Sequence, residues 1–100
     1  MEQRTKKRYK LRPGVVLVEI CGEYLLVATG EARGCCPYVT QINRAAAEYW
    51  RVFEQESELH AIVNRLCERS GKEKKSVLLP LYMFIQKMAK SGYLIEEEDV

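Results

Sequence analysis

The side chains best suited to covalent chemistry in this chain are its four cysteines. They are Cys21, Cys35, Cys36 and Cys67, and no two of them form the CxxC spacing typical of zinc sites and redox pairs. Cys35 and Cys36 are adjacent, and neighbouring residues rarely reach the geometry of a mutual disulfide. A reactive thiol needs a setting that stabilises the thiolate, and Arg33 alone is weak support for one. We therefore expect reduced thiols without a metal or redox role.

The single histidine and the glycines complete the candidates for catalysis. His60 is predicted to lie in the first turn of a packing helix, where a surface or half-buried histidine is more common than a catalytic base. The segment Gly30–Gly34 (GEARG) lacks the Lys-Ser/Thr pair and the strand-to-helix context of a phosphate-binding loop. No HExxH, GxSxG or GxGxxG motif occurs. The sequence therefore predicts a protein that is not an enzyme and holds no cofactor or metal.

Composition and charge are those of an ordinary globular domain. Of the 100 residues 47% are hydrophobic and 30% charged, and the net charge of +2 is too small to favour nucleic acid or an anionic membrane. A basic flexible tail (1–10) and an acidic tail (97–100) are predicted to flank a domain of residues 11–96. No secretory signal or membrane-spanning stretch is found, so we expect a cytoplasmic protein.

Strand signals fill the first half of the domain. Gly22 stands in a short hairpin connection between the first two strands, where a residue that tolerates positive φ is needed. A polar loop (30–37) leads to the third strand. That strand alternates, with Tyr38, Thr40 and Ile42 on one face. The predicted strands are residues 15–20, 24–29 and 38–42.

The pattern then changes to helical spacing. Asn43 and Ser57 are suitable N-caps for two helices, and Gly71 ends the second. Pro80 predicts that the third helix either begins near Leu79 or kinks there. Strands followed by helices predict an α+β fold, a three-stranded antiparallel sheet followed by three helices in a winged-helix-like arrangement. The predicted helices are residues 44–54, the segment between Ser57 and Gly71, and residues 76–90.

The third strand and the third helix are expected to form a binding surface. If the strand at 38–42 is an edge, its unpaired N–H and C=O groups can recruit an extended peptide. The third helix carries two apolar stripes, and a helix needs only one for its own core, so the second is either buried as well or faces a partner. A peptide in this groove would gain main-chain hydrogen bonds from the strand and pockets from the helix. The two stripes are Val77, Leu81, Phe84 and Met88, and Leu78, Tyr82, Ile85 and Ala89.

Several segments together resemble the PqqD-like proteins, over residues 9 to 96. The segments are Tyr-Lys-Leu-Arg-Pro-Gly before the first strand, Gly-Glu-Tyr-Leu-Leu-Val-Ala-Thr-Gly-Glu across the second, Thr-Gln-Ile-Asn-Arg-Ala-Ala-Ala-Glu-Tyr-Trp into the first helix, and the ending with Phe84-Ile85, Met88 and Gly92-Tyr93-Leu94-Ile95. They are loose apolar patterns around Asn43, Trp50 and Gly92, and no single residue is diagnostic.

The resemblance implies a winged-helix-like precursor-peptide recognition element. Such a domain binds the leader segment of a ribosomally made peptide as an extra strand on the third strand, packed against the third helix. It then delivers the precursor to a modifying enzyme, often a separate radical-SAM protein. This chain departs from the family pattern at Pro80, where an acidic residue is usual near the start of the helix. The implied peptide-binding residues are Tyr38, Val39, Thr40, Gln41, Ile42, Leu78, Tyr82 and Ile85.

Two other functions stay open. A DNA-binding winged helix would share the order of elements and could use Lys72, Lys74 and Lys75. Its third helix, however, offers mainly Leu, Tyr, Met and Ile, whereas Arg, Lys, Asn and Gln read the major groove, so nucleic acid is not the expected partner. Alternatively, a self-associating assembly subunit would fill its groove with a second copy and form a homodimer.

Overall fold

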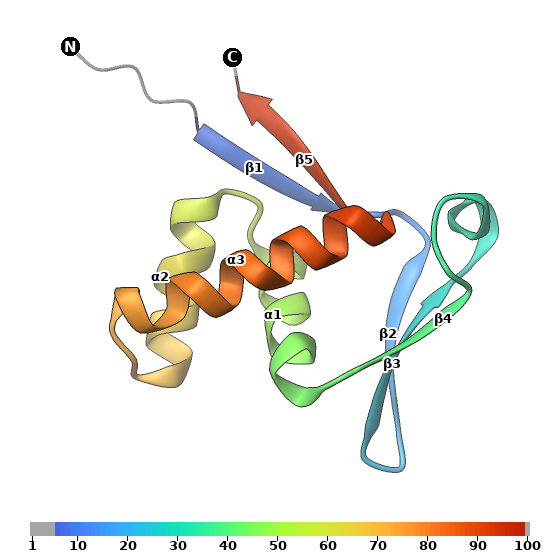
Figure 1. The fold of residues 1–100 in the computed structure, drawn as a ribbon, viewed down its shortest axis with the longest axis horizontal. Helices are drawn as coiled ribbons and strands as arrows, with labels where there is room; N and C mark the ends of the chain where they lie inside the picture. Colours follow the sequence, from blue (N-terminus) through green and yellow to red (C-terminus); the bar gives the residue numbers. More distant parts are fainter. Residues whose placement is uncertain (1–5, 100) are drawn as a thin grey trace.

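Five strands and three α-helices make up residues 6–99, the part of the chain that this computed structural model describes. The larger sheet is antiparallel and contains β2 (Val15–Ile20), β3 (Glu23–Ala28) and β4 (Val39–Ile42) in that order. Figure 1 shows this sheet beyond one end of the grouped helices, with a two-stranded ribbon running along the helices. The predicted fold class, α+β with a three-stranded antiparallel sheet followed by three helices, is confirmed.

The predicted hairpin closes through a two-residue turn. Ile20 lies opposite Glu23, and the turn residues Cys21 and Gly22 have φ values of 52° and 80°. Positive φ at both central residues defines a type I′ turn, whose twist matches that of the flanking strands. Beyond the hairpin, the predicted loop contains a short 3₁₀ helix, η1 (Gly30–Gly34).

The three helices are α1 (Arg44–Gln55), α2 (Leu59–Ser70) and α3 (Lys74–Ser91). Asn43 caps α1 as predicted, because its side chain accepts a backbone N–H of the first turn at 2.8 Å. Gly71 ends α2 in the left-handed conformation, also as predicted. Ser57 is not the cap of α2, which begins after Glu58. The Ser57 carbonyl instead accepts the N–H of Tyr9 at 2.7 Å.

Pro80 lies inside α3 and does not mark its start. The helix begins at Lys74 and continues through Pro80 to Ser91, so of the two alternatives that Pro80 predicted, a start near Leu79 is wrong. A proline inside a helix removes one hydrogen bond. Val77 and Leu81, on either side of Pro80, are both buried in the core, and the packing of this segment outweighs the lost bond.

The two ends of the domain pair with each other, which the sequence reading did not predict. β1 (Lys6–Leu11) runs antiparallel to β5 (Leu94–Asp99), with Tyr9 opposite Glu96. Residues 6–10 are therefore not a flexible basic tail, and residues 97–99 are not a separate acidic tail. The remaining parts of the two predicted tails, residues 1–5 and 100, lie outside the described residues.

The physical reason for the ribbon is opposite charge on the two strands combined with alternation along each. Lys7 forms an ion pair with Glu96 at 3.0 Å across the ribbon. Tyr9 is buried, and its ring meets that of Phe53 edge-on at 6.0 Å between centroids. Arg8 and Lys10 alternate with Tyr9 and Leu11, which face α1 and α2, so part of the charge that suggested a solvated tail lies on the outer face of a strand.

The core lies where the helices meet the inner face of the sheet and the ribbon. Trp50 of α1 is fully buried and meets Tyr93 edge-on, with ring centroids 6.3 Å apart. One predicted stripe of α3 is buried as a whole. The members of that stripe are Val77, Leu81, Phe84 and Met88.

Candidate functional site

β4 has a neighbouring strand on one side only within the described residues, so its other edge is open. The Ala28 N–H donates to the Tyr38 carbonyl at 2.8 Å. Ala28 and Tyr38 are therefore the first hydrogen-bonded pair of the β3–β4 ladder. Antiparallel pairs alternate, so Thr40 and Ile42 also direct their backbone groups to β3. Val39 and Gln41 then direct their N–H and C=O groups to the open edge. The edge thus offers two donors and two acceptors to another chain.

The side chains of β4 alternate as the sequence predicts. Thr40 and Ile42 point inward, whereas Val39 (57% exposed) and Gln41 point outward. The Thr40 hydroxyl forms a hydrogen bond with the Tyr93 hydroxyl, which also donates to the Pro37 carbonyl at 3.1 Å. Tyr93 follows α3, so these bonds hold β4 beside the end of that helix and give the edge a fixed position.

A cavity of about 600 Å³ opens between the end of β4, the start of α1 and one flank of α3. Its walls are mainly apolar and aromatic, as is typical of small binding sites. Met83 of α3 is 61% exposed at its rim. The lining residues are Gln41, Ile42, Asn43, Ala45, Ala46, Tyr49, Pro80, Met83, Phe84, Lys87 and Met88.

A second cavity, of about 560 Å³, adjoins the first. The two share Ala45, Tyr49 and Pro80 in their walls, so they adjoin between α1 and α3, and the second extends to the α2–α3 turn. The Tyr49 ring packs edge-on against Phe84 at 5.3 Å between centroids. Burial raises the pKa of Tyr49, so its hydroxyl stays neutral. We call these two adjoining cavities the groove.

The structure brings only part of the implied site together. Gln41 and Ile42 line the groove, but Leu78, Tyr82 and Ile85 do not. Ile85 is buried, whereas Leu78 and Tyr82 are exposed on the opposite flank of α3.

Burial is the main cause that raises the pKa of Tyr9 in the ribbon, and Glu96 on the facing strand adds to it.

The sequence reading missed every residue of α3 that lines the groove, and Pro80, Met83 and Lys87 are those beside the buried stripe. A helix turns 100° per residue, so these three lie on one flank of the buried stripe and Leu78 and Tyr82 on the other. The sequence shows that α3 has two flanks beside its core stripe. It carries no signal for which flank faces β4, because that depends on the direction in which α3 crosses the sheet.

The outer face of the three-stranded sheet, turned away from the core, is a second apolar surface. Leu26 and Ala28 of β3 are buried on the inner face, and their neighbours in the strand point outward. The cross-strand register places apolar residues of all three strands together on this outer face. They are Val16, Val18, Ile20, Leu25, Val27 and Val39.

The cysteines and the histidine do not form a site within the described residues. All four cysteines are free, and no group of three metal-binding side chains comes together in this part of the chain. Cys36 is buried and donates to the Gly92 carbonyl at 3.4 Å, and burial is the main cause that raises the pKa of its thiol. His60 is exposed. No helix among residues 6–99 has the length and hydropathy needed to cross a bilayer.

Comparison of the chain with protein-family models, with curated proteins and with solved structures gives no match. The features of the molecule that bear on its function are therefore the open edge of β4 and the groove.

Proposed function

We propose that this protein is a non-catalytic module that captures the leader segment of a ribosomally made precursor peptide by strand addition and presents it to a modifying enzyme. The observation that carries the proposal is the open edge of β4, which ends at an apolar groove. Strand addition needs both features, since backbone groups supply hydrogen bonds and pockets supply side-chain selectivity. The resemblance to PqqD-like proteins supports the same role and suggests a radical-SAM protein as the enzyme. The proposed place of action is the cytoplasm.

The bound peptide would extend the sheet by one strand. The backbone groups of Val39 and Gln41 can form up to four hydrogen bonds with it, and each contributes about 0.5–1.5 kcal/mol. Alternate side chains of an added strand point to the core side of the sheet, where the groove opens beside Met83. Burial of one large apolar side chain there contributes about 1.5–3 kcal/mol. The hydrogen bonds are independent of peptide sequence, so the groove determines which peptides bind.

An NMR titration with a synthetic leader peptide, taken from a short reading frame beside the gene, tests this proposal. We expect the largest amide shifts at residues 38–42 and at Met83 and Lys87, and small shifts at Leu78 and Tyr82. Gln41→Pro is expected to weaken binding about two- to tenfold. It removes a donor from the open edge, while the ladder to β3 uses the neighbouring residues.

Glu19→Pro is the matched control for Gln41→Pro. The Thr29 N–H donates to the Gly14 carbonyl at 2.8 Å, and the alternation from this pair makes Glu19 face the open edge of β2. The control therefore removes the same kind of donor from the other edge of the sheet, and we expect unchanged affinity. Shifts that spare β4, or equal losses in the two proline variants, would contradict strand addition at β4.

Self-association is a second candidate function, and the apolar outer face of the sheet favours it. Val16 and Ile20 are about half exposed there, and an apolar face shared by three strands is typical of a surface that another protein covers. If a second copy covers it, the mass measured by sedimentation should rise with concentration, and Val16→Lys should keep the protein monomeric. Leu79→Lys, at an exposed apolar residue of α3, is the control and should behave as the wild type. A wild type that stays monomeric at the highest concentration would speak against this candidate.

A further inference from the structure

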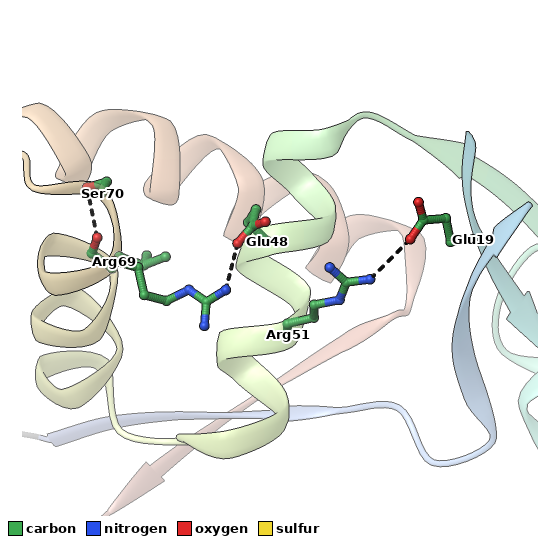
Figure 2. A network of polar contacts seen from close by, with 6 residues as sticks. Glu19, Glu48, Arg51, Arg69 and Ser70 are labelled. Carbon is green, nitrogen blue, oxygen red and sulfur yellow. Dashed lines mark hydrogen bonds and ion pairs between the residues drawn. The ribbon is translucent and has the colours of Figure 1, made fainter. Parts of the chain in front are cut away.

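The charges along the groove are unevenly balanced. Lys87 lies at the end near β4, and Lys72 and Arg69 lie at the far end, beside the α2–α3 turn. Glu48 is the only carboxylate among the residues that line the groove. Figure 2 shows Arg69 of α2 reaching across to Glu48 of α1, and their ion pair spans 2.9 Å. This pair neutralises both of its members, so the uncompensated charges of the groove are two lysines, one at each end.

The section between the two lysines is apolar. Tyr49 and Pro80 face both cavities, Phe84 borders the one near β4, and Leu66 and Val77 border the far one. A ligand that follows the groove must therefore be apolar in its middle and can gain from negative charge at both ends. Neither Lys72 nor Lys87 has an ion pair with a carboxylate among the described residues, so a ligand carboxylate would not have to displace one.

We infer that the peptide taken by this groove carries an acidic residue on each side of a short apolar segment, one pairing with Lys87 and the other with Lys72. The inference rests on the proposed function and deepens it, because it states the chemistry of the ligand. Strand addition at β4 uses only the first part of the groove. The inference requires the bound peptide to continue past Ile42, between α1 and α3, to the α2–α3 turn.

The length of α3 sets the spacing of the two acidic residues. An α-helix rises about 1.5 Å per residue, so the 13 steps from Lys74 to Lys87 cover about 20 Å. Lys72 precedes this segment by two residues. An extended peptide advances about 3.3 Å per residue, so a span of about 20 Å places its two acidic residues about six positions apart. The ion pairs are exposed, and each is worth about a threefold change in affinity at low salt.

Selection from a library of random 12-residue peptides displayed on phage tests the inference. We expect the wild type to enrich peptides with Asp or Glu on both sides of an apolar segment, about six positions apart. Selection against Lys72→Glu should lose the acidic preference at one end, and selection against Lys87→Glu should lose it at the other. Lys90→Glu changes a lysine of the same helix that does not line the groove, and it should select the same peptides as the wild type.

A synthetic peptide from the selection then measures the pairing directly. In this peptide, the acidic residue that pairs with Lys72 is replaced by the corresponding amide. The replacement should weaken binding to the wild type about threefold and leave binding to Lys72→Gln unchanged. Apolar peptides without an acidic preference, or the same preference in both charge-reversal variants, would overturn the inference. In that case, the proposed function would still stand if the selected peptides bind the Gln41→Pro variant more weakly than the wild type. If no peptide is enriched, or if the enriched peptides bind Gln41→Pro as well as the wild type, both fail.

Discussion

Gly92→Ala is expected to destabilise the protein by about 3 kcal/mol or more, although it adds a single methyl group. Gly92 ends α3 with φ of 91°, a conformation that costs an alanine about 1 kcal/mol. A Cβ at this position would also overlap the Cys35 carbonyl oxygen, which is backbone and cannot rotate away. Forcing extra volume into such a contact adds about 1–3 kcal/mol.

Gly71→Ala provides the matched control for this substitution. Gly71 ends α2 with φ of 73°, but a Cβ there would meet nothing within 4 Å. It should therefore cost only the conformational term, about 1 kcal/mol. The difference between the two variants in urea unfolding free energy isolates the overlap with Cys35. Equal losses would mean that the backbone near Cys35 relaxes freely.

The position of Gly92 connects this prediction to the open edge of β4. Its carbonyl accepts from Arg12 Nε at 2.9 Å and from the Cys36 thiol at 3.4 Å, and the next residue, Tyr93, is bonded to Thr40 of β4. A shift of this turn would thus displace the strand that we propose as the binding edge. Gly92→Ala should therefore weaken peptide binding at β4 as well as stability.

The elements between β2 and α3 could be predicted from sequence because their signals are local. Gly22 marks the I′ turn, Asn43 caps α1 and Gly71 ends α2, and each acts on residues within one turn of itself. The β1–β5 ribbon pairs residues about 90 positions apart, such as Tyr9 and Glu96. No local pattern announces such a pairing, and the charges on both strands are equally typical of solvated tails.

The candidate site likewise has one part that local sequence signals predict and another that depends on tertiary packing. The strand β4 was predictable, because Thr40 and Ile42 alternate with outward residues over a short run that follows a loop. Its open edge was only a condition of the sequence reading, because it depends on the order of strands in the sheet. For the groove, the sequence predicts that a flank of α3 faces β4, but it does not indicate which flank. Its far end also joins α2 to α1 through Arg69 and Glu48, which are 21 residues apart, and their contact depends on how the helices pack.

Trp50→Ala is expected to cost about 3–5 kcal/mol, which is a large part of the stability of a domain of this size. Trp50 is the only tryptophan of the chain and is 0% exposed. It packs edge-on against Tyr93 at 6.3 Å between centroids, and Tyr93 in turn holds Thr40 and the Pro37 carbonyl. The cavity left by alanine would therefore loosen both the core and the support of β4.

Trp50→Phe is expected to cost much less, about 1–2 kcal/mol. Phenylalanine is larger than alanine, but this is not the only reason. The buried indole N–H of Trp50 has no hydrogen-bond partner among the described residues, so the native core already bears the cost of an unpaired donor, about 1–3 kcal/mol. Phenylalanine loses part of the packing but removes that donor. Urea unfolding followed by far-UV circular dichroism measures both variants. Equal losses for the two would show that ring packing with Tyr93 contributes little, because only Trp50→Phe retains an aromatic ring beside Tyr93.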